Sequence, residues 1–282
     1  MVVTTAEAAV AAVPRKQEEM EDNAEAVLEG LQGLRELVQA DADLVCPVTD
    51  EFLSRFLWAA DLDVKKSYHL VQEYFAARRD YPDVFLLNDP NMYVSIFESN
   101  ELGFELADRD ALGRRIFVAR IGDMDPTRHK FEEVLQTCLM TLESLSVDPE
   151  VQRLGIVVLV DITRFSYKLV RWLTPYKIKV SLKFLQDCIP IKMQAFYCVN
   201  APRVFSLTYN AVKPLMKEEF RRKISWHNGD LSSLHKVIPP CVLTKDFGGT
   251  GEVNWADWFN HVLEKKPMFE ELKSYGYVKQ RK

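Results

Sequence analysis

The side chains that could carry catalysis are few and scattered along the 282-residue chain. Asp161 follows the apolar run IVVLV and could act as a catalytic carboxylate or bind a ribose, but an aspartate at the end of a strand is more often a cap or a turn residue. His227 lies close in sequence to Ser225 and Asp230. Catalytic triads are assembled by geometry rather than by local sequence, so this adjacency is more typical of a structural histidine.

Motifs for nucleotides and metals are equally scarce. GGTG at Gly248 to Gly251 is the one glycine-rich loop, and a dinucleotide fingerprint needs a glycine where Asn254 stands, which favours a simple turn. The sequence contains no GxxxxGK, HExxH or GxSxG motif. Its five cysteines form no CxxC pair, and its five histidines form no i, i+4 pair. We therefore expect free buried thiols, no metal site, no cofactor and no enzymatic activity, which leaves binding as the favoured function.

The composition is that of a soluble globular protein, with 48% hydrophobic and 27% charged residues. The most apolar stretch, LGIVVLV, is far shorter than the roughly 20 residues of a transmembrane helix. The first fourteen residues lack the basic region of a secretory signal, so a cytosolic location is expected. The net charge of −5 argues against nucleic-acid binding, but residues 1–50 hold eleven acidic and three basic side chains, so about +3 is left for the remainder. Any basic function is therefore local.

The stretch 186–229 combines a buried strand, an apolar helix and a basic cluster. Met193 to Val199 is apolar apart from Gln194, as expected for a strand buried on both faces. After Pro202, helical spacing places four side chains together: Phe205, Thr208, Tyr209 and Val212. The following KPLMKEEFRRK has a local excess of three positive charges. Such a helix either closes over an apolar site at an anionic membrane or is a buried helix with an ordinary solvated basic end.

The remaining patterns indicate a helical module followed by an α/β domain. Helical periodicity runs over residues 23–38, 50–61 and 64–81, and later over 131–145, 168–187 and 253–266. Strands are expected at 116–121, 156–162 and 193–199. Alternation of strands and helices predicts a mainly parallel sheet with right-handed crossovers. We divide the chain into a mobile tail (1–20), a helical module (21–88), an α/β domain (89–265) and a charged C-terminal tail (266–282).

Six motifs resemble those of the CRAL-TRIO lipid-binding family in order and spacing, between about Leu34 and Leu263: DEFLSRFLWAADLDVKKS, GRRIFVARIGDMDP, GIVVLVDI, IPIKMQAFYCVNAP, NAVKPLMKEEFRRKI and LTKDFGG. Within the family, the chain is most similar to the branch of the α-tocopherol transfer protein, cellular retinaldehyde-binding protein and the clavesins. The resemblance implies an N-terminal three-helix module and an α/β domain, in which the mainly parallel sheet floors one deep apolar pocket closed by a lid helix.

The resemblance also implies roles for individual residues. The implied pocket wall comprises Leu135, Cys138, Leu139, Leu142, Ile156, Val160, Phe165, Leu173, Phe184, Ile189, Ile191, Met193 and Phe196. The implied inner face of the lid comprises Phe205, Thr208, Tyr209 and Val212, and the implied membrane or phosphoinositide contacts are Lys192, Lys217, Arg221, Arg222 and Lys223. Without the resemblance, each residue of the pocket wall would be assigned to plain core.

Two departures from the family pattern bear on function. Lys192 and Lys223 match basic positions of a headgroup groove in the tocopherol-transfer branch, whereas other positions of that groove are not basic here: Ala60, Gln194 and Glu219. Arg164 stands after VDIT, where the family usually has glycine, and this change would alter the turn at the pocket mouth.

The leading prediction is therefore a cytosolic, monomeric carrier of one hydrophobic small molecule, such as tocopherol, a retinoid or a related isoprenoid. It would associate transiently with anionic membranes and transfer its ligand there through lid opening. The alternative is a phosphoinositide-binding adaptor in membrane traffic, in which the pocket is secondary.

Overall fold

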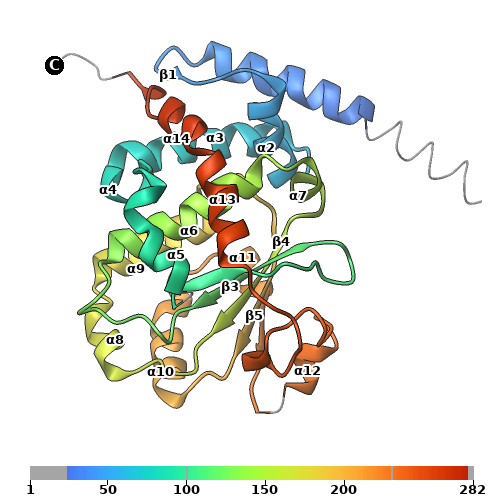
Figure 1. Cartoon of the computed structure of the whole chain (residues 1–282). Coiled ribbons are helices and arrows are strands. Elements are labelled where there is room, and N and C mark those ends of the chain that lie inside the picture. Colours follow the sequence, from blue (N-terminus) through green and yellow to red (C-terminus); the bar gives the residue numbers. More distant parts are fainter. Residues whose placement is uncertain (1–23, 100, 230, 279–282) are drawn as a thin grey trace, which may run out of the picture.

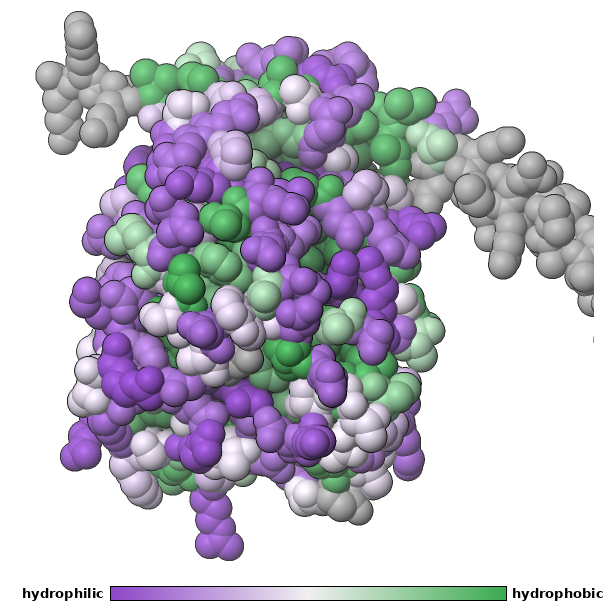
Figure 2. All heavy atoms as spheres, in the orientation of Figure 1, coloured by the Kyte–Doolittle hydropathy of each residue, from purple (hydrophilic) through white to green (hydrophobic). Residues whose placement is uncertain are grey.

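The computed structural model describes residues 24–99, 101–229 and 231–278, so the tail expected at residues 1–20 lies outside the described ranges. Figure 1 shows the N-terminal helices and the last helix stacked across one end of a sheet that is flanked by the other helices. Hydrophilic residues dominate the face drawn in Figure 2, where hydrophobic residues form only small separate areas. No helix within the described ranges is long and apolar enough to cross a membrane.

A five-stranded sheet forms the centre of the α/β domain, in the order β2-β3-β4-β5-β6. Strand β2 pairs antiparallel with β3, and every later pair is parallel, as the unbroken apolar runs predict. Phe117 lies beside Val158, which lies beside Phe196, so these three side chains share one face of the sheet. The strands are β2 (Gly103–Glu105), β3 (Arg115–Arg120), β4 (Ile156–Asp161), β5 (Met193–Val199) and β6 (Ile224–His227).

Helices connect and cover the strands in the predicted α/β order. The longest helix of the α/β domain, α6 (Phe131–Ser146), separates β3 from β4 and is buried along most of its length. The other helices of this domain are η1 (Pro90–Tyr93), α5 (Val94–Ser99), α7 (Pro149–Leu154), α8 (Tyr167–Trp172), α9 (Pro175–Gln186), α10 (Arg203–Val212), η2 (Lys213–Leu215), α11 (Glu218–Arg222), α12 (Ser232–His235), η3 (Lys245–Phe247) and α13 (Trp255–Glu264).

The predicted N-terminal three-helix module is confirmed: a helix over residues 24–40, then α2 (Asp50–Ala59) and α3 (Val64–Asp80), followed by the short α4 (Pro82–Phe85). Helix α2 begins after Thr49, whose side chain accepts a hydrogen bond from the Phe52 amide at 3.3 Å. Helix α3 begins after Asp63, whose carboxylate caps two backbone amides. These caps satisfy amides that have no partner inside the helix, which explains why each helix begins where it does.

The structure differs from the sequence-based expectation at several places. Pro175 begins a new helix, so the helix expected at 168–187 is two helices, α8 and α9. The basic region after Met216 leads into strand β6, which the sequence did not predict. The expected charged tail also contains α14 (Lys266–Leu272) and β7 (Gly276–Tyr277), and β7 pairs with β1 (Leu44–Val45). Phe269 and Leu272 of α14 are buried, so hydrophobic packing holds this segment despite its charge.

Candidate functional site

An apolar cavity of about 230 Å³ lies between the sheet and the helices α6, α8, α9 and α10. Nearly all of its wall consists of carbon and sulfur atoms of hydrophobic side chains. It is lined by Leu102, Phe117, Ala119, Arg120, Ile121, Met124, Phe131, Val134, Leu135, Cys138, Leu142, Val158, Phe165, Trp172, Leu173, Ser181, Phe184, Leu185, Met193, Phe196 and Phe205.

Helix α6 contributes one continuous stripe to this wall. Its lining residues recur at helical spacing from Phe131 through Leu135, Cys138 and Leu142, so one face of the helix looks into the cavity. Burial raises the pKa of the Cys138 thiol to about 12. The thiol is therefore protonated and unreactive at neutral pH, and acts as a small apolar group in the wall.

The sheet supplies the opposite wall through side chains that alternate along each strand. Phe117 and Ala119 of β3 line the cavity, whereas the Arg120 guanidinium pairs with Asp246 of η3. Because neighbouring residues of a strand point to opposite faces, the Arg120 side chain points away from the cavity. Among the described lining residues, only Ser181 of α9 carries a side-chain hydroxyl.

Helix α10 closes one side of the cavity and is the least buried part of the wall. Phe205 lines the cavity and meets the Phe165 ring edge-on, with ring centroids 5.0 Å apart. Tyr209 meets Trp226 of β6 in the same way, also at 5.0 Å. No residue of α10 is fully buried. A few aromatic contacts therefore hold this helix in place, and little apolar surface would have to be uncovered to move it.

The four residues of the implied lid face lie together on the inner side of α10. They are half-buried, whereas Leu207 and Ala211 on the opposite side are exposed. The Thr208 hydroxyl donates to the Val204 carbonyl at 3.0 Å, so its polar group is satisfied within the helix. The exposed side continues into η2, where Leu215 is also uncovered.

Eight residues of the implied pocket wall lie on this cavity: Leu135, Cys138, Leu142, Phe165, Leu173, Phe184, Met193 and Phe196. The other five lie in the surrounding core, outside the lining of this cavity: Leu139, Ile156, Val160, Ile189 and Ile191.

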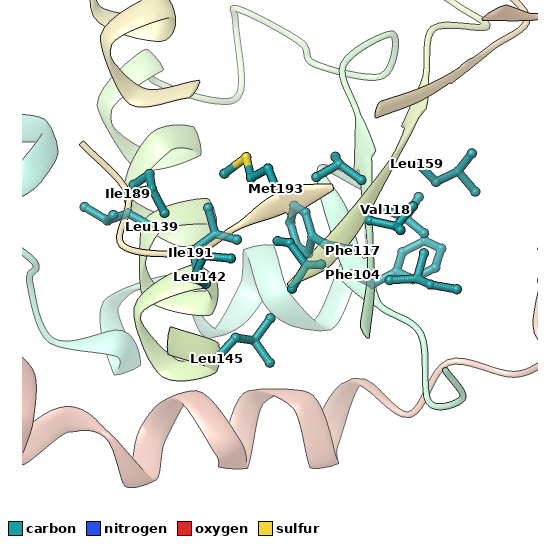
Figure 3. Close-up of a cluster of buried hydrophobic side chains, with 14 of the residues drawn as sticks. Phe104, Phe117, Val118, Leu139, Leu142, Leu145, Leu159, Ile189, Ile191 and Met193 are labelled. Carbon is teal, nitrogen blue, oxygen red and sulfur yellow. The ribbon is translucent and has the colours of Figure 1, made fainter. Parts of the chain in front are cut away.

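The reasons for these five differences are local. Leu139 follows Cys138 by about 100° around the helix, and in Figure 3 it lies near Ile189 rather than near the sheet. Ile189 and Ile191 fill the junction between α9 and β5, close to α6 (Figure 3). Ile156 and Val160 share the Val158 face of β4 but lie nearer the strand ends.

The predicted basic residues after the lid are largely paired with neighbouring carboxylates. Lys217 Nζ lies 2.6 Å from Asp187 Oδ1. Arg221 and Arg222 both bind Glu218, and the hydrogen bond from Arg222 and the charge of Arg221 lower the pKa of the Glu218 carboxyl. Lys217, Glu218 and Arg222 are exposed, whereas Asp187 and Arg221 are partly buried. Ion pairs at such a surface contribute little to stability.

The two positions that match the headgroup groove lie at one edge of the sheet. Lys192 directly precedes β5 and Lys223 directly precedes β6, and parallel strands begin at the same edge. Lys192 forms an ion pair with Asp61 at the end of α2, whereas Lys223 is exposed.

The departures from the family pattern have simple local roles. Gln194 donates to a backbone carbonyl at 3.0 Å, and Arg164 pairs with Asp123 with most of its side chain in solvent. Ala60 is the C-cap of α2, and Glu219 is exposed. None of these side chains reaches the cavity.

The residues first considered for catalysis have structural roles. Asp161 accepts hydrogen bonds from the Thr163 amide at 3.0 Å and from the Thr163 hydroxyl, which makes it a turn residue. His227 binds Ser233 Oγ at 2.9 Å rather than Ser225, and Asp230 lies outside the described residues. A side chain at Gly249 would collide with the Leu243 carbonyl oxygen, so the glycine loop is a tight turn. No group of three metal ligands occurs within the described ranges.

Several cavity residues were not anticipated from the sequence. Trp172, Met124 and Phe131 close the end of the cavity near α8, and Trp226 supports the lid from β6. The one available signal was the alternation in β3, which places Phe117 and Ala119 on the face shared with Phe196. The tryptophans carry no such signal because they lie at helix ends and in an unpredicted strand.

The chain matches the CRAL/TRIO domain over residues 102–249, a region that includes β2 to β6 and most of the cavity wall. It is 32% identical over 253 residues to the human alpha-tocopherol transfer protein-like protein, and the matched region covers 89% of this chain and 73% of that protein. It is 31% identical to rat clavesin-1 over 238 residues, covering 82% of this chain and 66% of clavesin-1.

The chain belongs to the CRAL/TRIO family. The crystal structure of Sfh5 has the same fold, with a TM-score of 0.52, coverage of 86% of this chain and 98% of that chain, and 15% sequence identity. Membership of this lipid-binding family agrees with an almost wholly apolar cavity. The fold predicted for this CRAL/TRIO protein is thereby confirmed.

Proposed function

We propose that this CRAL/TRIO protein is a carrier that holds one hydrophobic small molecule in the apolar cavity and transfers it at membranes when α10 moves. The observation that carries the proposal is the cavity itself: an almost wholly apolar wall closed by a half-buried helix. Tocopherol, a retinoid and related isoprenoids are the ligand classes that fit such a wall. A cytosolic location and a monomeric state are part of this proposal.

Burial of the ligand supplies enough free energy for tight binding without any charged contact. Covering some 300 to 500 Å² of isoprenoid surface, at roughly 25 cal/mol per Å², gives on the order of 10 kcal/mol before the costs of association. Ser181 provides one hydrogen-bonding group, which favours a ligand with a long apolar body and a single polar end.

The size of the cavity gives the lid a further role. Sites for drug-sized ligands occupy about 300 to 1,000 Å³, whereas this cavity measures about 230 Å³. A long isoprenoid therefore needs more room than the closed arrangement offers. Outward movement of α10 would break the contacts of Phe205 with Phe165 and of Tyr209 with Trp226, so ligand uptake and lid displacement are coupled.

The outer side of the lid supports release at a membrane. Leu207 and Leu215 are 67% and 64% exposed, and basic side chains flank them in η2 and α11. Apolar residues that enter the bilayer interface and lysine or arginine residues that meet anionic headgroups are the two usual elements of peripheral binding. Docking of this side would favour the open lid.

The alternative, a phosphoinositide-binding adaptor, has less support from the geometry. Of the two matching positions, Lys192 is engaged by Asp61, and the departures at Ala60, Gln194 and Glu219 contribute no positive charge. A general preference for anionic lipid fits the surface better than selection of one headgroup.

Ligand binding is tested by native mass spectrometry of protein purified from cells, followed by solvent extraction of the bound molecule. Fluorescence titration with retinol and with tocopherol should then saturate at one molecule per chain. Absence of saturable binding to any isoprenoid or phospholipid would refute the carrier function.

The membrane step is tested by charge reversal on α11. Arg221→Glu with Arg222→Glu should slow transfer to anionic vesicles while leaving binding in solution nearly unchanged, because both side chains lie outside the cavity. Lys236→Glu with Lys245→Glu is the matched control, since it makes the same charge change in segments that do not line the cavity. Transfer of the unmodified protein should also fall as salt rises. Equal transfer rates for both variants, whatever the salt and lipid charge, would show that electrostatic attraction to anionic lipid does not contribute to transfer.

A further inference from the structure

A second hollow, of about 270 Å³, lies between α13 and the strands β2 and β3, and we refer to it as the α13 cleft. In Figure 1, α13 runs down toward β3 at this edge of the sheet. The wall of the α13 cleft contrasts with that of the apolar cavity because half of the residues that line the cleft are ionisable. The cleft is lined by Glu105, Leu106, Ala107, Arg115, Asn254, Asp257, Trp258 and His261.

The sheet places two opposite charges in the cleft. Glu105 pairs with Phe117 across the strands, so Arg115, two residues before Phe117, shares the face of Glu105. Arg115 Nη1 lies 2.9 Å from Glu105 Oε1, and the carboxylate is 8% exposed. The charge of Arg115 is therefore already matched by Glu105.

Helix α13 supplies the facing wall. Trp258 and His261 lie one turn apart and form the deep part, whereas Asp257 and Asn254 are exposed at the rim. Burial, and then the charge of Lys265, lower the pKa of His261 and so favour the neutral ring. The imidazole can therefore offer one nitrogen as an acceptor.

Besides Glu105 Oε1, which faces Arg115 in the ion pair, three buried polar atoms of this cleft have no hydrogen-bond partner within the described part of the chain: Arg115 Nε, Trp258 Nε1 and His261 Nε2. Trp258 is only 7% exposed. Buried polar atoms are almost always paired in folded proteins because leaving one unpaired is costly. Three such atoms around one hollow therefore point to a molecule that completes their hydrogen bonds.

The chemistry of these atoms limits what can bind. An anion would meet Glu105 and Asp257, and a cation would bring N–H groups against the Arg115 and Trp258 donors. A hydroxyl group avoids both conflicts because it accepts from an N–H group and donates to a carboxylate or to His261. The volume admits about nine water molecules at ~30 Å³ each, or one six-membered ring bearing several hydroxyls.

We propose that the α13 cleft binds a neutral polyhydroxylated molecule of monosaccharide or cyclitol size. The site is separate from the apolar cavity, since no residue lines both. It does not depend on the carrier function, and binding of a lipid and of a polyol can be measured independently.

The test is titration of the ¹⁵N-labelled full chain with glucose and with myo-inositol, following the indole N–H signals of the five tryptophans. The Trp258 signal, identified by its loss in Trp258→Phe, should shift and saturate. Calorimetry should show affinity at least about tenfold weaker in Trp258→Phe, which retains the aromatic ring but lacks the donor. Trp226→Phe, the same change beside the lid, should leave polyol affinity unaltered.

Arg115→Lys provides a second variant that keeps the ion pair with Glu105 but removes the Nε–H donor, and about a tenfold loss is again expected. Cyclohexanol, phosphate and spermidine serve as probes with one hydroxyl, with negative charge and with positive charge. Saturable shifts with the two polyols alone support the proposal. A Trp258 signal that does not respond to either polyol, or that responds better to phosphate, spermidine or a peptide, would overturn it.

Discussion

Glu143→Gln should strongly destabilise the protein because Glu143 is the shared partner of two buried arginines. Its carboxylate lies 3.0 Å from Arg55 Nη1 and 2.8 Å from Arg78 Nη2, and all three side chains are almost inaccessible to solvent. Ser146 Oγ accepts a further hydrogen bond from Arg55. Arg55 belongs to α2, Arg78 to α3 and Glu143 to α6, so this cluster joins the helical module to a helix that lines the cavity.

The expected loss of stability can be estimated from the buried charges that the substitution leaves unpaired. Glutamine keeps the shape of the side chain but leaves two buried guanidinium groups without a countercharge, and breaking a buried pair in this way costs about 3–5 kcal/mol. With a Tm change of about 2–4 °C per kcal/mol for a protein of this size, the Tm should fall by ~6–20 °C. Ligand affinity should also decrease, because Cys138 and Leu142 lie on the same helix.

The pH dependence gives an independent check. Burial by itself would raise the pKa of Glu143, but Arg78 and then Arg55 outweigh it and lower that pKa below its ordinary value of 4.5. The folded state therefore holds the proton less tightly than the unfolded state. The resulting stability is present above about pH 4.5 and is lost as the pH falls toward the folded pKa, and Glu143→Gln should remove this part of the acid sensitivity.

Urea unfolding at neutral and acidic pH measures both effects. Glu133→Gln is the matched control, since it makes the same change in the first turn of α6, where Glu133 pairs with Lys130 at 3.2 Å near the surface. That pair should contribute no more than about 1 kcal/mol. Similar small losses for the two variants, or an unchanged acid response in Glu143→Gln, would show that the buried cluster does not stabilise the fold.

Further predictions concern the cavity and its surroundings. Phe196→Asp should abolish ligand binding in a protein that is still folded by circular dichroism, because it places an unpaired carboxylate in an apolar wall; unchanged affinity would exclude Phe196 from the ligand site. Alkylation at pH 7 should label the exposed Cys241 rapidly and leave Cys138 intact until unfolding, as peptide mass mapping would show, and rapid labelling of Cys138 would contradict the closed cavity. Leu207→Asp should weaken vesicle binding in sedimentation assays without affecting retinol affinity, and equal sedimentation would remove the lid from the membrane contact.

Local periodicity was sufficient to predict most of the architecture. The stripe along α6, the apolar runs of β4 and β5, and the inner face of α10 all follow from spacing within one element. The motifs in register then indicated the family, which the matches to related proteins confirmed. Strand β6 escaped prediction because its four residues follow a basic segment and show little apolar alternation.

By itself, the sequence determined which residues are apolar, which face of the longer elements they occupy and the alternation of strands and helices from β3 to α10. Only the tertiary structure decided that Cys138 faces a cavity while Leu139 fills solid core, because periodicity assigns a face but not the space beyond it. The partners of charged groups were also decided there, as in Lys217 with Asp187 and Glu143 with two arginines. Such pairs join residues far apart in the chain, and their distances depend on how the elements pack.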